Sequence, residues 1–233
     1  MIQSEPCIGS SLALPATASS AAPIGALVTF STDRPGSGAP SADPVGRAEL
    51  RTRLRRERRA IDAAVATASA AAAAGIAGDL PWWHAAGSVA TYVATGGELD
   101  PQPLAERARR EGKGTYVPVL HDSELRFASD DADAEWVPNR FGIPEPAGSR
   151  LEPAELDLVI VPALAVDADG RRLGHGGGFY DRSFSWLRGV PRPSSVVLVG
   201  FVHDLQVIDA VASEPWDVTL DAILTPTRWW ACG

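Results

Sequence analysis

The fold of this chain is decided by the apolar stretch LDLVIVPAL (Leu156–Leu164) and by the glycine-rich segment RLGHGGGFYDR (Arg172–Arg182) that soon follows it. The apolar stretch lacks polar alternation, which is typical of a central strand buried on both faces of a sheet. The second segment sets four glycines among two arginines, a histidine and an aspartate. Glycines permit positive φ and let several backbone N–H groups approach one ligand, so the segment is typical of an anion-binding loop.

The residues after the glycines, FYDRSFSWL (Phe179–Leu187), are predicted to form a helix whose N-terminus points at the same anion. The glycine spacing matches neither the Walker loop nor the dinucleotide-binding fingerprint. On the glycines alone, a plain tight turn is an equal alternative. The density of Arg172, Asp181 and Arg182 around them favours phosphate and metal chemistry instead.

Helices and strands are predicted to alternate along the chain from Gly46 onward. Two helices are expected within residues 47–78, separated near Ile61, with Asp62 capping the second, and a further helix over residues 101–112. Besides the central strand, strands are predicted over residues 88–95, 114–120, 124–129, 194–202 and 220–225, with 124–129 in a hairpin. This order predicts a three-layer α/β/α fold with a mostly parallel central sheet, and a glycine-rich phosphate loop after a central strand, where open sheets bind ligands.

The chain of 233 residues suits one catalytic α/β domain over residues 46–233. Residues 1–45 are rich in Ser, Ala, Pro and Gly, so we expect a disordered N-terminal extension that the folded domain does not need.

The bulk composition excludes several classes of protein. The net charge of −8 argues against nucleic acid as a partner, because phosphate backbones call for basic surfaces. Cys7 and Cys232 form no disulfide framework, no apolar run approaches a membrane span of about 18 residues, and the N-terminus lacks the basic region of a secretory signal. We therefore expect a cytoplasmic monomer that binds neither membranes nor nucleic acid.

No other catalytic or metal motif stands out in the chain. His84, His121, His175 and His203 are widely separated and no cysteine accompanies them, which argues against a structural zinc site. The nucleophile motif GxSxG does not occur.

The segment PALAVDADGRRLGHGGGFYDR (Pro162–Arg182) resembles the signature of the 5-formyltetrahydrofolate cyclo-ligase family, also called methenyltetrahydrofolate synthetases. Flanking segments resemble other parts of the family in the same order: RAELR (Arg47–Arg51), TGGELD (Thr95–Asp100), FGIPEP (Phe141–Pro146) and WDVTLDAILTP (Trp216–Pro226). The resemblance covers residues 47–226 and implies ATP-dependent closure of 5-formyltetrahydrofolate to 5,10-methenyltetrahydrofolate, with release of ADP and phosphate.

The resemblance also implies which residues bind ATP and magnesium. The residues expected to bind ATP are Arg47, Arg51, Arg172, Leu173, Gly174, His175, Gly176, Gly177, Gly178, Phe179 and Tyr180. Among them, the residues expected to act directly in catalysis are Arg172, Gly174, Gly176 and Gly178. Asp181 and Asp217 resemble the Mg²⁺ ligands, and two carboxylates suffice for a cation that also takes phosphate oxygens and water.

The folate substrate is expected to contact a second set of residues: Val93, Glu98, His175, Gly176, Gly177, Gly178 and Phe179. The carboxylate of Glu98 can accept two N–H bonds from the edge of a 2-amino-4-oxopterin. Two positions depart from the family pattern, because Arg47 replaces a usual lysine and Phe179 a usual tyrosine. These departures keep a second function open, a non-catalytic paralogue that binds nucleotide or folate without turnover.

Each of these residues also has a plainer structural interpretation. Arg172 can be an exposed turn residue, Asp181 a helix cap, and Glu98 and Asp217 solvated loop carboxylates. Val93, Phe179 and Tyr180 can belong to the core. The other arginines of the first predicted helix are interpreted as solvated surface, with a nucleic-acid-binding arm as the disfavoured alternative: Arg53, Arg55, Arg56, Arg58 and Arg59.

Overall fold

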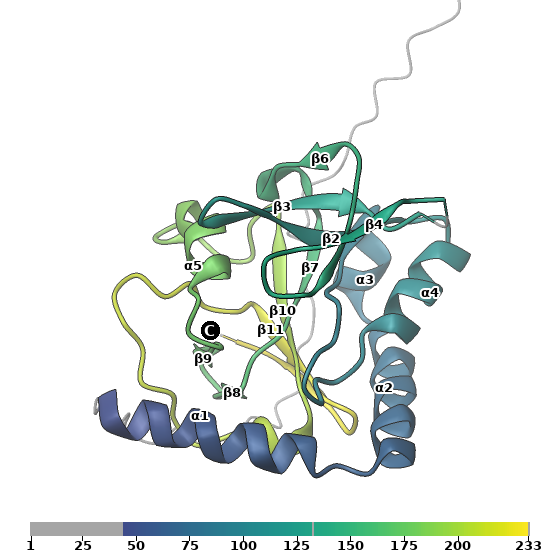
Figure 1. Cartoon of the computed structure of the whole chain (residues 1–233). Coiled ribbons are helices and arrows are strands. Elements are labelled where there is room, and N and C mark those ends of the chain that lie inside the picture. Colours follow the sequence, from purple (N-terminus) through teal and green to yellow (C-terminus); the bar gives the residue numbers. More distant parts are fainter. Residues whose placement is uncertain (1–43, 132, 233) are drawn as a thin grey trace, which may run out of the picture.

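The structure, a computed structural model, describes residues 44–131 and 133–232 (Figure 1). The predicted extension therefore lies outside the described residues, apart from two that begin the first helix, α1 (Pro44–Arg59). Helix α2 (Ala63–Ala77) follows, and the Asp62 carboxylate caps it as predicted by accepting hydrogen bonds from the N–H groups of Ala64 and Val65.

A mostly parallel sheet forms the middle of the molecule, as the sequence predicts, and it has eight strands. Its strands in spatial order are β12 (Trp229–Ala231), β11 (Ala222–Leu224), β10 (Val197–Phe201), β7 (Leu158–Val161), β1 (Ser88–Ala90), β2 (Gly114–His121), β3 (Glu124–Ser129) and β6 (Arg150–Leu151). The pairs from β11 through β2 are parallel, while the outer strands β12, β3 and β6 pair antiparallel. Every residue of β7 is buried, and its side chains alternate between the cores on the two faces of the sheet.

Helices cover both faces of the sheet (Figure 1). On one face lie α2, α3 (Pro81–Ala85) and α4 (Gln102–Arg110), and the small side chains of α2 pack there with Trp83 and Leu104. The other face is covered by the short α5 (Phe179–Ser183), the 3₁₀ helix η2 (Ser185–Leu187) and the loops around them. Two further 3₁₀ turns lie in loops, η1 (Pro153–Glu155) before β7 and η3 (Asp204–Gln206) after β10.

Two small hairpins lie beside the main sheet, and the sequence pattern predicted neither. Strands β8 (Ala165–Val166) and β9 (Arg172–Leu173) form the first hairpin, which separates β7 from the glycine-rich loop. Helix α1 packs across this hairpin, with Leu54 against Leu173 and Val211. The second hairpin pairs β4 (Trp136–Pro138) with β5 (Pro144–Pro146).

Several predicted elements are shorter than their sequence patterns indicated. The predicted helix over residues 179–187 is only a five-residue α-helix, because Phe184 takes φ −110° and the chain continues as a 3₁₀ turn. Strand β1 ends at Ala90, although the N–H of Thr91 still donates to the Tyr116 carbonyl. Short elements such as α3, β6 and β12 gave no periodic signal long enough to be read.

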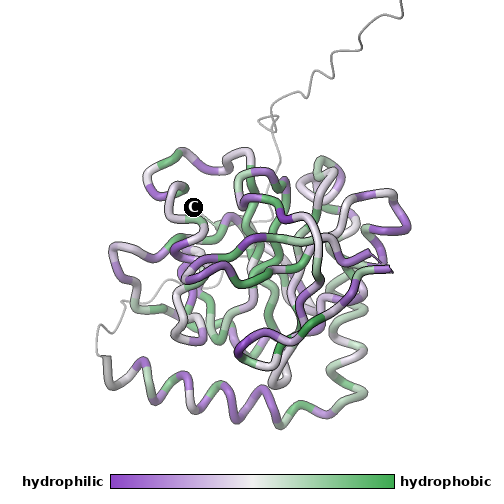
Figure 2. Tube along the Cα trace, turned by 45° about the horizontal axis from the view of Figure 1, so that its top comes forward, coloured by the Kyte–Doolittle hydropathy of each residue, from purple (hydrophilic) through white to green (hydrophobic). Residues whose placement is uncertain are grey.

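Hydrophobic segments are concentrated in the sheet, whereas α1 is largely hydrophilic (Figure 2). Among the described residues, no single helix is long and apolar enough to cross a membrane. The segments Gly46–Arg59 and Ala63–Ala77 pass that test only as a pair, by length and composition, and they are bent by 100°.

Candidate active site

The glycine-rich loop, residues 174–178, connects β9 to α5 at the centre of the candidate site. Gly176 and Gly178 take φ values of +108° and +64°, which side chains other than glycine rarely adopt. No described residue accepts a hydrogen bond from the N–H groups of Gly176, Gly177 or Gly178. Because α5 has only five residues, its dipole adds little to the attraction for an anion, which must come from the loop's own N–H groups and from the arginines around the loop.

Two pockets meet at this loop. The first has a volume of about 630 Å³ and the second about 400 Å³. Their shared lining consists of Arg172, Gly174, Gly177, Gly178 and Asp181. A ligand in one pocket therefore contacts the same short segment as a ligand in the other.

The first pocket is lined mainly by charged side chains. Its arginines are Arg47, Arg51, Arg172, Arg182 and Arg188, and its carboxylates are Glu124, Asp181, Glu214 and Asp217. Clustered arginines suit phosphate oxygens, and carboxylates among them suit a divalent cation. Trp216 also lines this pocket and is 59% exposed, although no role was predicted for it from the sequence.

Arg172 is held by a buried ion pair beneath the loop. It is 7% exposed, and its Nη2 donates to Oδ1 of Asp181 at 2.5 Å, while Nη1 donates to the Val218 carbonyl. The same Oδ1 accepts from the N–H of Val218 at 3.1 Å. Burial lowers the pKa of Arg172, but a guanidinium stays charged at neutral pH. Arg172 is therefore not an exposed turn residue, and Asp181 binds Arg172 and Val218 rather than capping its helix.

Asp217 is also more than a solvated loop carboxylate. Its Oδ2 accepts a hydrogen bond from the N–H of Glu214 at 2.9 Å and lies 3.8 Å from Nη2 of Arg47. Arg47 in turn donates from Nη1 to Oε1 of Glu214 at 3.1 Å. Asp181 and Asp217 line one pocket, yet the described residues include no group of three or more His, Cys, Asp or Glu placed to hold a metal ion.

Helix α1 supports the loop through a row of arginines. Nε of Arg51 donates to the Gly174 carbonyl at 3.1 Å, and Nη2 of Arg55 donates to the His175 carbonyl at 3.0 Å. Arg58 is buried, whereas Arg53 and Arg56 are exposed. The interpretation of the latter as solvated surface is therefore confirmed, whereas for Arg55 and Arg58 it was wrong.

The signal that identifies these arginines was present in the spacing. Positions 47, 51, 55 and 58 fall on the same helical stripe as Leu50 and Leu54, which pack against the domain. Arginines on that stripe must face the protein, and those on the opposite face must face solvent.

Glu98 lies in the second pocket with its side chain only 7% exposed, so it is no solvated loop residue. Its Oε2 accepts hydrogen bonds from the N–H and hydroxyl of Thr95, and its Oε1 lies 2.9 Å from Nε2 of His175 and 3.6 Å from Nη1 of Arg58. Burial would raise the pKa of Glu98, but these hydrogen bonds and the Arg58 charge together lower it. The carboxylate is thus held ionised in a largely apolar pocket.

The second pocket is lined by aromatic and aliphatic side chains. Val93, Phe179 and Tyr180 lie there, and the last two also pack against the core. The Tyr180 hydroxyl is buried without a hydrogen-bond partner among the described residues, and burial raises its pKa.

The hairpin β4–β5 contributes a wall of this pocket that the sequence argument had not assigned. Phe141 is 58% exposed and meets the ring of Phe179 edge-on at 6.0 Å. The turn is fixed because Oδ1 of Asn139 accepts from two backbone N–H groups and its Nδ2 donates to Glu145. The sequence did point to this hairpin, because the FGIPEP segment resembles the family, but no role was predicted for that segment.

The predicted site residues divide between the two pockets. Of the residues predicted for ATP, His175, Phe179 and Tyr180 line only the second pocket. Of those predicted for folate, Gly176 lines only the first. Leu173 lines neither pocket and is buried beneath α1.

The sequence model of the 5-formyltetrahydrofolate cyclo-ligase family matches residues 44–226. The 5-formyltetrahydrofolate cyclo-ligase of Escherichia coli (strain K12) is 40% identical over 150 residues, which cover 61% of this chain and 80% of that relative. The one of Mycolicibacterium smegmatis is 33% identical over 198 residues, covering 79% of this chain and 96% of the relative.

Solved structures give the same picture of the fold. The NMR structure of Aquifex aeolicus 5,10-methenyltetrahydrofolate synthetase is similar with a TM-score of 0.69 and 26% identity, covering 79% of this chain and 92% of that one. The 5,10-methenyltetrahydrofolate synthetase of Mycoplasma pneumoniae has a TM-score of 0.60 at 20% identity, with 77% and 98% covered, and supports the fold alone.

The turn before Glu98 gives a test of how tightly α1 and the second pocket are joined. Gly97 has φ +79°, and a Cβ there would lie 2.9 Å from the Arg58 carbonyl oxygen. We expect Gly97→Ala to lower the free energy of unfolding by about 1–3 kcal/mol for the φ strain alone, and further for the contact. Gly112→Ala is the matched control, because Gly112 has φ +74° and open space around it. Equal losses in urea unfolding would mean that α1 yields to the added methyl group.

Proposed function

The chain belongs to the 5-formyltetrahydrofolate cyclo-ligase family, and we propose that it closes 5-formyltetrahydrofolate to 5,10-methenyltetrahydrofolate with ATP and Mg²⁺. One observation carries the finer part of this proposal. A charged pocket and a largely apolar pocket share the glycine-rich loop, so a phosphate in one is adjacent to a ring system in the other.

The proposed chemistry explains why both pockets are needed. A formamide oxygen is a poor leaving group, so this oxygen first attacks the γ-phosphorus of ATP and ADP departs. N10 of the folate then attacks the activated formyl carbon and loses its proton to solvent, the C–O bond breaks, and inorganic phosphate leaves. Such a reaction depends on positioning the two substrates and on stabilising charge at the transferred phosphoryl group.

In this proposal the first pocket holds the nucleotide. The loop N–H groups and Arg172 contact the transferred phosphoryl group, while Arg47 and Arg51 neutralise the other phosphates. Trp216 offers an aromatic face to the base.

Asp181 and Asp217 are the residues that would hold Mg²⁺ there. Two carboxylates in one pocket fit a cation that completes its coordination with phosphate oxygens and water, and the ion would offset charge that builds up on the phosphates. No separate all-protein metal cage is required.

The second pocket would hold the pterin. Its apolar and aromatic walls suit a flat ring, with Phe179 and Phe141 as the aromatic contacts and Val93 beside them. Glu98, held ionised, accepts N–H bonds from the edge of the ring.

We also propose that the enzyme acts in the cytoplasm as a monomer, on reduced folate and ATP alone. The acidic composition and the lack of a disulfide framework support this proposal. Light scattering at working concentration should give the mass of one chain, and a dimer would contradict it.

Turnover is tested by mixing the purified protein with 5-formyltetrahydrofolate, ATP and Mg²⁺ and following the near-ultraviolet absorbance of the product. Wild type should form product only when both ATP and metal are present. Asp181→Asn, which keeps an acceptor for Arg172, should lower kcat by about 10²-fold or more, because it removes charge from the metal site. The exposed Asp209→Asn is the control and should remain active. Binding of ATP or folate without product would instead support the non-catalytic paralogue.

Glu98→Gln tests the assignment of the second pocket. The amide keeps the size of the side chain but removes the charge, so KM for 5-formyltetrahydrofolate should rise about tenfold or more while KM for ATP changes little. Glu145→Gln serves as the control for a carboxylate in the same pocket that binds its own hairpin. A larger change in the KM for ATP would assign Glu98 to the nucleotide.

A further inference from the structure

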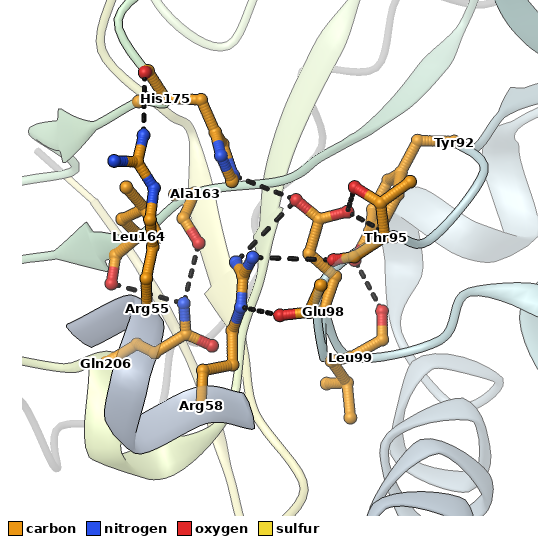
Figure 3. Close-up of polar contacts among 12 residues, drawn as sticks. Arg55, Arg58, Tyr92, Thr95, Glu98, Leu99, Ala163, Leu164, His175 and Gln206 are labelled. Carbon is orange, nitrogen blue, oxygen red and sulfur yellow. Dashed lines mark hydrogen bonds and ion pairs between the residues drawn. The ribbon is translucent and has the colours of Figure 1, made fainter. Parts of the chain in front are cut away.

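Arg58 is a buried arginine of α1 that lies behind Glu98, and the reaction chemistry leaves it without a role. Its side chain is 2% exposed. Nε donates to the Gly96 carbonyl at 3.1 Å, Nη2 to the Thr95 carbonyl at 3.4 Å, and Nη1 lies 3.6 Å from Oε1 of Glu98 (Figure 3). The guanidinium thus holds both ends of the turn that carries Glu98.

The Glu98 carboxylate has donors on both of its oxygens. Thr95 occupies Oε2 with its N–H and its hydroxyl, and His175 and Arg58 both point at Oε1 (Figure 3). His175 is 39% exposed and lies on the glycine-rich loop, so an incoming ring can displace it. Arg58 has no route to solvent and must stay, so it is the permanent partner of the carboxylate.

The burial of Arg58 is hard to explain by stability alone. A buried charge is costly unless all its donors are paired, and Nη1 has no hydrogen-bond partner among the described residues. An apolar side chain on this stripe would pack as Leu54 does, without that cost. Burial lowers the pKa of Arg58, yet the guanidinium stays charged beside the one carboxylate in its reach.

We propose that Arg58 is a positioning residue for the folate pocket, which holds the turn that carries Glu98 and keeps the Glu98 carboxylate aimed at the pterin edge. The inference rests on the proposed role of Glu98 in folate binding. It assigns to α1 a second task, since the same helix that supports the phosphate loop through Arg51 and Arg55 then also sets the geometry of the carboxylate on the folate side.

Arg58→Met keeps an unbranched side chain that can pack along the stem of the arginine, and it removes the charge and the hydrogen-bond donors. The dissociation constant for 5-formyltetrahydrofolate, measured by calorimetry without ATP, should rise about tenfold or more, whereas that for Mg²⁺–ATP should stay within about twofold. Arg53→Met, at an exposed position of the same helix, should change neither. Arg58→Lys should fall between wild type and Arg58→Met, because it keeps the charge but not the fork of donors.

Two readouts separate positioning from a merely structural role. Combining Arg58→Met with Glu98→Gln should weaken folate binding hardly more than Glu98→Gln alone, because Arg58 acts through the Glu98 carboxylate and has nothing to position once that carboxylate is gone. The pH dependence of folate binding should also move. Besides the hydrogen bonds from His175 and Thr95, the Arg58 charge lowers the pKa of Glu98, so the acidic loss of binding should begin at a higher pH in Arg58→Met than in wild type.

His175, Tyr92 and Tyr180 also face Glu98 and are present in both proteins. Burial and the Arg58 charge lower the pKa of His203, so the His203 imidazole must be titrated beside the Glu98 carboxyl to separate the two. Thermal unfolding identifies variants that fail to fold. If Arg58→Met does not fold, the same measurements are made on Arg58→Lys.

A carbon-13 NMR titration of the Glu98 carboxyl distinguishes failure of the proposed function from failure of this inference. A wild type that does not bind folate contradicts the proposed function. An unchanged titration of Glu98 in Arg58→Met, or folate binding unaffected by that substitution, overturns the inference.

Discussion

The active site depends on arginine side chains of α1 that donate hydrogen bonds to backbone carbonyls of loops distant in sequence. Arg51 and Arg55 bind consecutive carbonyls of the glycine-rich loop, and Arg58 binds those of the turn before Glu98. Glycine-rich segments lose much conformational freedom on folding, so they need external partners to stay ordered. The loop's carbonyls are thus held by α1, and no described residue accepts a hydrogen bond from the N–H groups of Gly176, Gly177 or Gly178 beside the first pocket.

The parallel sheet and the position of the loop were predictable because they follow from local pattern. The unbroken apolar run of residues 156–164 indicates a strand buried on both faces, and a glycine cluster after it indicates a ligand loop. Short elements were not predictable in this way, because two or three residues carry no period. The β8–β9 hairpin and the early end of α5 depend on tertiary packing, with Leu173 buried under α1 and Phe184 in the core.

The site residues divide along the same line. Those of the glycine-rich segment, which line the two pockets, were singled out from local density, whereas Arg58 donates to a turn about 40 positions away and was interpreted as solvated surface. Arg58 lies on the same helical stripe as Leu50 and Leu54, which indicates that it faces the domain. The arginines of this helix were interpreted as one group, so this difference among them was missed. Phe141 was missed for another reason, since only the folded chain brings its hairpin against Phe179.

The shared wall between the two pockets also has an evolutionary consequence. A substitution at Gly174, Gly177 or Gly178 alters the walls of both pockets at once, so these positions have little freedom to drift. The outer walls belong to separate elements, α1 and the segment around Asp217 on one side and the β4–β5 hairpin on the other. Selection can therefore change the walls of one pocket at a time, while the loop at which the two pockets meet stays fixed.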